Sequence, residues 1–175
     1  GTVNTVVRRK SGSLSGHNTD CESFAAELNR FGIEVSGKKC VILGVGPLSE
    51  AVKTVLLERN ARTVQILFPE REVLNRARNV DLLLNTVGAF GDRKVHLAPL
   101  PAERLSNVRE VLDLTALEQP SGLLLEAWAR DIPAYGGLYM FIEGLRRSAE
   151  LFLDESIPKK ATEELYDRFS REYNR

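Results

Sequence analysis

The chain has 175 residues, of which 43% are hydrophobic and 27% are charged, and these proportions are typical of one globular domain with its own core. Its 24 lysine and arginine residues balance its 24 aspartate and glutamate residues, which gives no support to a nucleic-acid or membrane partner. No apolar run reaches the ~18 residues of a membrane span. The isolated thiols of Cys21 and Cys40 favour a reducing compartment, so we expect a cytoplasmic protein.

The first elements are a strand over residues 3–7 and a turn at 11–13. A helix is predicted next, because Thr19 or Asp20 can cap it, apolar residues follow at helical spacing and Gly32 can end it. The later strands are expected at 40–43, 63–68, 80–84, 108–114 and 132–135. One later helix should bury an apolar face at 51, 52, 55 and 56, and the others are expected over 72–78, 122–130, 138–153 and 159–173, with a polar stretch at 88–106.

This alternation of strands and helices predicts the fold class. Parallel strands need helical crossovers, and such crossovers are right-handed. We therefore expect a Rossmann-like three-layer α/β/α domain over residues 1–175, with a mostly parallel sheet of about six strands.

The clearest motif is the turn after the strand at 40–43. It reads Gly44-Val45-Gly46-Pro47-Leu48-Ser49 and opens a helix. In dinucleotide-binding folds such a turn holds a pyrophosphate against the helix N-terminus. Gly44 permits the tight turn and Gly46 permits close approach of the pyrophosphate. Ser49 stands at the third glycine position and Pro47 lacks an amide donor, so the motif favours the architecture more than retained cofactor binding.

The choice between NAD and NADP should depend on the end of the second strand of this unit. Glu70 would suit the ribose hydroxyl of NAD, and Arg71 would suit the 2′-phosphate of NADP. A charged loop without a cofactor role is the simpler alternative.

Three further stretches resemble the C-terminal domain of the shikimate dehydrogenase family. They are residues 1–6 (Gly-Thr-Val-Asn-Thr-Val), 16–20 (Gly-His-Asn-Thr-Asp) and 81–86 (Asp-Leu-Leu-Leu-Asn-Thr). The resemblance implies that a nicotinamide cofactor accepts a hydride from a hydroxyl-bearing carbon of shikimate, while a lysine and an aspartate bracket that hydroxyl.

The resemblance also assigns roles to particular residues. It makes Asp20 the catalytic aspartate and Asn4 a substrate ligand, and it places Thr86, Gly137 and Met140 beside the cofactor, together with the Gly44–Ser49 loop. A helix cap is the alternative for Asp20, and a hydrogen bond at a strand end is the alternative for Asn4.

Several family features are missing here. The resemblance places the catalytic lysine of the family in an N-terminal substrate domain, which we expect these 175 residues to lack, since they begin at the Val-Asn-Thr motif. The family's Asn-Arg-Thr cofactor loop is replaced by residues 68–70, and the tyrosine and proline expected after Asp113 are absent. Gly144 occupies the position of a substrate-binding glutamine. Nearby, Arg146 and Arg147 are expected on a solvated helix face.

These observations favour hydride transfer between NADP or NAD and a small shikimate- or quinate-type hydroxy acid, once the chain is joined to its substrate domain. The isolated chain is expected to be inactive. The alternatives are a catalytically silent regulatory or scaffolding domain, similar to the fungal quinate repressor, and a metabolite sensor that needs no cofactor.

Overall fold

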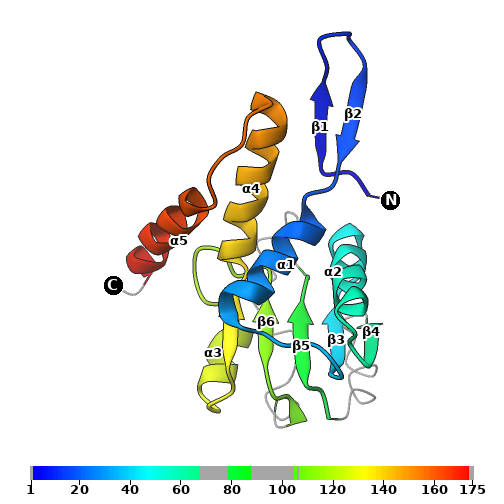
Figure 1. Ribbon diagram of the computed structural model, residues 1–175. Helices are drawn as coiled ribbons and strands as arrows, with labels where there is room; N and C mark the ends of the chain where they lie inside the picture. The colour runs from blue at the N-terminus through cyan, green and yellow to red at the C-terminus, as the bar shows by residue number, and fades with distance from the viewer. Residues whose placement is uncertain (1, 68–78, 88–104, 106, 174–175) are drawn as a thin grey trace.

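The computed structural model describes residues 2–67, 79–87, 105 and 107–173. Within these residues, five strands form a parallel sheet in the spatial order β4–β3–β5–β6–β7 (Figure 1). In chain order the strands are β3 (Lys39–Leu43), β4 (Thr63–Leu67), β5 (Leu82–Asn85), β6 (Val111–Asp113) and β7 (Ala134–Gly136).

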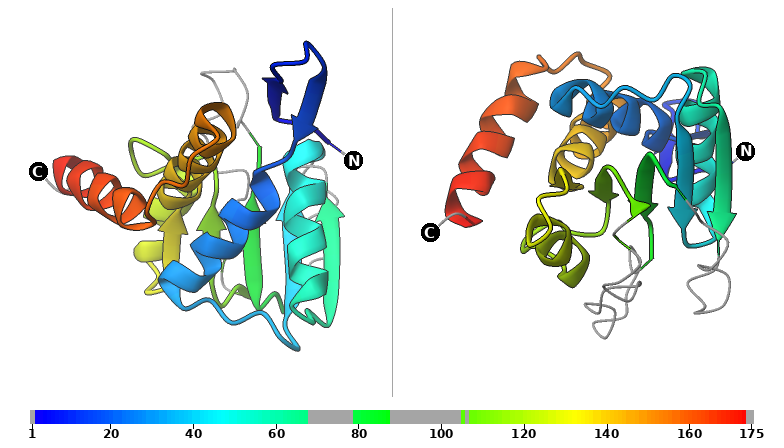
Figure 2. Two further views of the ribbon diagram at one scale, coloured as in Figure 1. Left: turned by 45° about the horizontal axis from the view of Figure 1, so that its top comes forward. Right: turned by 90° about the horizontal axis from the view of Figure 1, so that it is seen from below.

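Helices cover both faces of this sheet (Figure 2). One face packs against α1 (Asp20–Phe31), α2 (Pro47–Glu58) and α4 (Leu138–Leu153), and the other packs against α3 (Gly122–Trp128). Side chains of β3 alternate between the two cores: Cys40 and Ile42 lie with the first set of helices, and Val41 and Leu43 lie with α3. Since all four are fully buried, the structure confirms the Rossmann-like three-layer fold.

Most element boundaries agree with the sequence to within a few residues. Gly32 ends α1 in the left-handed conformation at φ 65°, and α4 has its predicted bounds. Helix α2 begins at Pro47, within the turn that was expected to open it, and proline is tolerated in a first helical turn. The last helix, α5, covers Lys160–Tyr173. The predicted helix at 72–78 and nearly all of the polar stretch at 88–106 lie outside the described residues. None of the described helices combines the length and apolarity required to cross a membrane.

The first predicted strand does not join the main sheet. It is β1 (Thr5–Arg8), which pairs antiparallel with β2 (Leu14–His17) in a hairpin that projects from the domain (Figure 1). The sequence did not predict β2, because serine and glycine are poor strand formers. The expectation of about six sheet strands is therefore too high for the described chain, where the parallel sheet has five.

Glu27 of α1 is completely buried and holds the start of α4. Its Oε2 accepts a hydrogen bond from the backbone N–H of Met140 at 2.5 Å. Burial raises the pKa of Glu27 to about 8, although the Met140 bond and the charge of Arg30 oppose this shift. Glu27 thus ties the first turn of α4 to α1 mainly as a protonated carboxyl at neutral pH.

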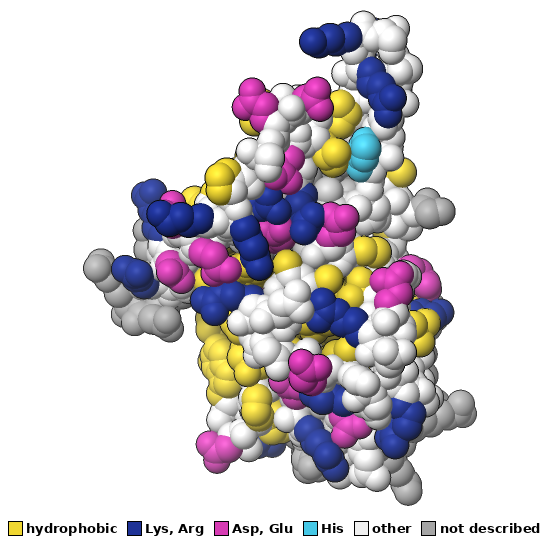
Figure 3. Space-filling model, viewed as in Figure 1, with side chains coloured by type: hydrophobic (Ala, Val, Ile, Leu, Met, Phe, Trp, Pro, Cys, Tyr) yellow, Lys and Arg dark blue, Asp and Glu magenta, His cyan; other side chains and the backbone are white. Residues whose placement is uncertain are grey.

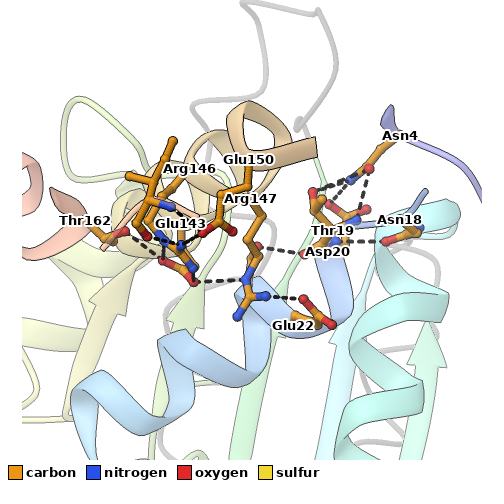
Figure 4. Close-up of polar contacts among 12 residues, drawn as sticks. Asn4, Asn18, Thr19, Asp20, Glu22, Glu143, Arg146, Arg147, Glu150 and Thr162 are labelled. Carbon is orange, nitrogen blue, oxygen red and sulfur yellow. Dashed lines mark hydrogen bonds and ion pairs between the residues drawn. The ribbon is translucent and has the colours of Figure 1, made fainter. Parts of the chain in front are cut away.

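A second buried carboxylate joins α4 to α5. Glu143 is 1% exposed and forms a two-point ion pair with Arg146, at 2.7 and 2.9 Å (Figure 4). It also accepts a 2.7 Å hydrogen bond from Thr162 of α5 and pairs with Arg147 at 2.9 Å. Burial acts to raise the pKa of Glu143, but these partners hold it below its ordinary value.

The same contacts overturn the expectation that Arg146 and Arg147 lie on a solvated helix face. The side chain of Arg146 is only 11% exposed, and it also donates to Glu150 and to the carbonyl of Ile157, at 2.7 Å each. Arg147 reaches across to Glu22 of α1. Charge alone suggested solvent exposure, whereas Arg146 is enclosed between α4 and the segment before α5, and Arg147 is held between α4 and α1.

We expect a Glu27→Gln variant to flatten the pH dependence of stability. The folded-state pKa, about 8, lies above the ordinary value of 4.5. The stabilisation is therefore complete below pH 4.5 and is lost as the pH rises through about 8. Urea unfolding of the wild type should give a free energy of unfolding that falls across this interval, and the glutamine variant should show a smaller fall. The same fall in the free energy of unfolding for the wild type and for Glu27→Gln would contradict this prediction. The control is Glu58→Gln, which changes an exposed glutamate of α2.

We expect a Glu143→Ala variant to lose about 3–5 kcal/mol of stability, because it leaves two arginines without their buried partner. The matched control is Glu164→Ala, which breaks an exposed 3.0 Å pair with Lys160 and should cost about 0.2–1 kcal/mol. Both values can be measured by chemical denaturation. A loss for Glu143→Ala no larger than that of the control would show that the buried network contributes little.

Candidate functional site

The order of the sheet strands locates the candidate site. The chain passes from β3 to β4 on one side and then returns to β5 on the other side of β3. In open α/β sheets, ligands bind at the carboxyl ends of the strands where the order reverses in this way. Here the point of reversal lies between Gly44, which follows β3, and Thr86, which follows β5.

The loops after β3 and β5 are in direct contact. Gly44 has φ 107°, and a Cβ atom there would lie 2.5 Å from Oγ1 of Thr86, so the fold itself requires glycine. Thr86 donates to the carbonyl of Leu43 at 2.7 Å. Ser49 donates to the carbonyl of Gly44 at 2.9 Å and lies 2.8 Å from Thr86 Oγ1. Ser49 stands at the third glycine position, and its hydroxyl also joins the glycine loop to α2 through these hydrogen bonds.

Gly46 differs from Gly44, since nothing in the fold requires glycine there. Its φ of 162° is extended, and a Cβ atom would meet no atom of the described residues within 4 Å. Pro47 occupies the first turn of α2, where its missing N–H costs no helical hydrogen bond. The next amides, of Leu48 and Ser49, belong to the helix start and have no helical acceptor. Open space beside Gly46 and free helix-start amides fit a pyrophosphate group.

Asn4 and Asp20 meet beside this loop, at the junction of the hairpin and α1 (Figure 4). Asn4 Nδ2 donates to Asp20 Oδ1 at 2.8 Å and to Thr19 Oγ1 at 3.1 Å, while its Oδ1 accepts from the backbone N–H of Thr19 at 3.0 Å. These bonds fix the orientation of the Asn4 amide. Burial raises the pKa of Asp20, and the bond from Asn4 partly opposes that shift.

The helix-cap alternative for Asp20 is wrong for this structure. The N-cap of α1 is Thr19, whose own side chain makes no capping hydrogen bond. The backbone N–H of Asp20 donates to Asn18 Oδ1 at 2.8 Å. The Asp20 carboxylate is therefore available for contacts outside the helix.

Five of the predicted residues line one cavity of about 320 Å³, which is within the range of small-molecule sites. Its walls include Asn4, Asp20, Leu48, Gly137 and Met140. A Cβ atom at Gly137 would lie 2.5 Å from the carbonyl oxygen of Leu114, so glycine there allows α4 to approach the loop after β6. Met140 is 8% exposed, and its N–H is held by Glu27.

Asp113 organises the loop that closes this cavity. It is fully buried and accepts hydrogen bonds from the side chains of Asn85 at 2.9 Å and Ser121 at 2.5 Å. It also accepts from the backbone and hydroxyl of Thr115, at 3.0 and 2.7 Å. Leu114 and Thr115 thereby reach the cavity, although nothing in their sequence spacing indicated it.

Some predicted residues lie elsewhere. Arg71, Glu70 and the altered loop at 68–70 are outside the described residues. His17 lies on the hairpin, with Nε2 2.9 Å from Ser15 Oγ. Across the described chain, no three His, Cys, Asp or Glu side chains cluster closely enough to hold a metal ion. Basic and acidic side chains are mixed over the face shown in Figure 3, in line with the balanced composition.

Comparison with known proteins gives relatives of one kind, although no protein-family model matches the chain. The NADP(+) shikimate dehydrogenase of Thermococcus kodakarensis is 31% identical over 157 residues, covering 81% of this chain and 57% of that protein. The corresponding enzyme of Caldanaerobacter subterraneus is 26% identical over 187 residues, covering 91% of this chain and 65% of that protein. The chain thus spans less than two thirds of the length of these relatives.

Solved structures of shikimate dehydrogenases also resemble this chain. Shikimate dehydrogenase 1 from Peptoclostridium difficile superposes with a TM-score of 0.89 at 24% identity, over 98% of this chain and 68% of that one, which supports the fold. Shikimate 5-dehydrogenase from Thermus thermophilus, solved with NADP(H) and shikimate, gives a TM-score of 0.77 at 26% identity, over 95% of this chain and 67% of that one. Sequence and fold therefore agree over most of its length that this chain is related to the shikimate dehydrogenases.

Proposed function

We propose that this chain is the nicotinamide-binding domain of an NADP-dependent oxidoreductase that acts on a small hydroxy acid of the shikimate type. The observation that carries the proposal is the contact of two features at one sheet edge. Open space beside Gly46 lies at the start of α2, and the Asn4–Asp20 pair lines the adjoining cavity with Leu48 of the same helix. Curated relatives named for NADP(+), and a neighbour solved with NADP(H) and shikimate, support this choice of cofactor and substrate.

Each group in the site has a role in this proposal. The start of α2, with Gly46, Leu48 and Ser49, would hold the pyrophosphate, while Gly137 and Met140 would border the nicotinamide. When bound, NADP⁺ supplies the acceptor for the hydride that leaves the hydroxyl-bearing carbon. Asp20 would take part in removing the hydroxyl proton, so that the alcohol becomes a ketone, and Asn4 would keep the carboxylate oriented. NAD remains the alternative cofactor, and quinate the alternative substrate.

The proposal includes a substrate domain that supplies the lysine and most substrate contacts. The projecting hairpin supports it, because two strands alone are marginally stable. Apolar side chains on and near the hairpin are exposed, with Val3 at 57% and Leu14 at 70%. A cleft of about 1090 Å³ separates the hairpin from the end of α4, where Phe152 is 61% exposed. We propose that the substrate domain covers these surfaces.

A regulatory or sensing domain without catalysis is the second candidate. It is favoured by Gly144, which offers the cavity no side chain where the family resemblance predicts a glutamine. The two candidates differ in cofactor binding, because a dehydrogenase must bind NADP and a silent descendant or a cofactor-free sensor need not.

Calorimetric titration with NADP tests this directly on the isolated chain, and we expect binding that Gly46→Val weakens at least tenfold. The valine side chain would occupy the space proposed for the pyrophosphate, while the extended backbone of Gly46 accepts valine. Gly44→Ala is the structural counterpart, since its Cβ would meet Thr86, and it should lower thermal stability. No binding of NADP or NAD by the wild type at millimolar concentration would reject the dehydrogenase proposal.

We expect the isolated chain not to oxidise shikimate with NADP, because half of the proposed active site is supplied by the substrate domain. Fused to such a domain with its lysine, the chain should gain activity, and Asp20→Asn should then lower kcat about 10²–10⁴-fold through loss of acid–base assistance. Cofactor reduction followed by absorbance measures both results. Turnover by the isolated chain, or full activity of the Asp20→Asn fusion, would show that these roles are misassigned.

A further inference from the structure

Ser148 is the polar side chain that α4 contributes to the cavity beside Asp20. The other α4 residues on this wall of the described chain carry neither a hydroxyl nor a charge, and they are Met140, Phe141, Gly144 and Leu145. Ser148 lies four residues after Gly144, so the two positions share one face of the helix, one turn apart. Ser148 is partly exposed, whereas the charged residues of the same helix are engaged in the network around Glu143 (Figure 4).

Gly144 offers no hydrogen bond to a ligand, although the fold would accept a side chain there. A Cβ atom at Gly144 would lie 3.5 Å from Ser23 Oγ and 3.8 Å from Thr19 Oγ1, which are ordinary contact distances. This part of the cavity is therefore surrounded by hydroxyl groups at the start of α1. With glycine at this position, Ser148 is the α4 side chain that remains to hydrogen-bond a substrate.

A series of hydrogen bonds joins Ser148 to Asp20. Ser148 Oγ lies 3.0 Å from Thr5 Oγ1, and Thr5 donates to Asn4 Oδ1 at 3.1 Å. Asn4 Nδ2 then donates to Asp20 Oδ1 at 2.8 Å. All four residues line the cavity. Ser148 and Asp20 therefore stand at the two ends of one polar strip on the cavity wall.

The direction of these bonds makes Ser148 a hydrogen-bond acceptor toward the cavity. The backbone N–H of Thr19 lies 3.0 Å from Asn4 Oδ1, which identifies that atom as the amide oxygen, because a backbone N–H can only donate. The single hydroxyl hydrogen of Thr5 is directed at the same oxygen, so Ser148 donates its own hydrogen to Thr5. Ser148 Oγ then keeps its lone pairs but has no hydrogen left for a ligand, and it fits a hydroxyl donor.

We infer that Ser148 is a substrate-binding residue that accepts a hydrogen bond from a second hydroxyl of the substrate, while Asp20 faces the first. The inference rests on the proposed function and deepens it, because it restricts the substrate to hydroxy acids with at least two hydroxyls. An acid with one hydroxyl would leave the Ser148 oxygen without a donor in the closed site, and an unpaired polar group disfavours binding. Ser148 thereby determines specificity for polyhydroxylated acids.

The test compares shikimate, which has three ring hydroxyls, with 3-hydroxycyclohex-1-enecarboxylate, which has one. Both acids are titrated by calorimetry into the chain joined to its substrate domain, with NADPH bound so that the cofactor cannot accept a hydride. We expect Ser148→Ala to weaken shikimate binding about three- to tenfold, which corresponds to the loss of one hydrogen bond. The same variant should leave binding of the single-hydroxyl acid unchanged. Ser148→Thr keeps the hydroxyl and should retain shikimate binding.

The comparison of two acids distinguishes substrate binding from a purely structural role. If Ser148 only joined α4 to the hairpin through Thr5, its loss would weaken both acids equally. The control is Ser36→Ala, which changes an exposed serine before β3, at the opposite end of the sheet, and should leave both affinities unchanged.

Three results would overturn the inference: equal weakening of both acids by Ser148→Ala, no weakening of shikimate, or no binding of shikimate by a protein that binds NADPH. Titration with NADPH alone separates these results from failure of the proposed function, which requires cofactor binding. A protein that binds NADPH and shikimate but is insensitive to Ser148→Ala keeps the proposed function and loses only this role of Ser148.

Discussion

The contact between the loops that follow β3 and β5 is the constraint on which the site depends. Gly44 turns the chain so closely against Thr86 that a side chain at position 44 would overlap the threonine hydroxyl. Ser49 joins the same cluster of hydrogen bonds from the first turn of α2. Because this cluster sets where α2 begins, it also leaves Gly46 beside open space at the sheet edge. The proposed site for an anionic cofactor group therefore depends on how two neighbouring parallel strands end.

The position of α4 sets the other wall of the cavity. Glu27 holds the N-terminal turn of α4 from α1, and Glu143 links the middle of the helix to α5. Gly137 lets the helix start closely approach Leu114, whose loop is held by the buried Asp113. These contacts direct the charged residues of α4 away from the cavity and leave its apolar residues facing the Asn4–Asp20 pair. Helix α4 thus carries a buried ionic network on one side and uncharged residues that line the cavity on another.

Local patterns predicted the fold well because they report short-range physics. The apolar run at 40–43 predicted a buried parallel strand, and Gly32 predicted a helix end, since few residues adopt the left-handed conformation found there. The hairpin was only half predicted, because β2 carries little strand propensity and forms by pairing with β1. The prediction that Arg146 and Arg147 face solvent was wrong for a related reason: their partners include Ile157 and Glu22, and charge alone could not show these contacts between separate segments.

The sequence by itself determined the layered α/β architecture and the glycine turn, because periodicity and motifs are properties of neighbouring residues, and its motifs carried the resemblance to shikimate dehydrogenases. Asn4, Asp20, Gly137 and Met140 were named through resemblance, yet only the tertiary structure decided that they border one cavity. It also decided that Gly44 is required by the fold whereas Gly46 and Gly144 are not. Those distinctions depend on contacts between residues far apart in the chain, such as Gly44 with Thr86 and Gly144 with Ser23, and the packing of helices on the sheet creates them.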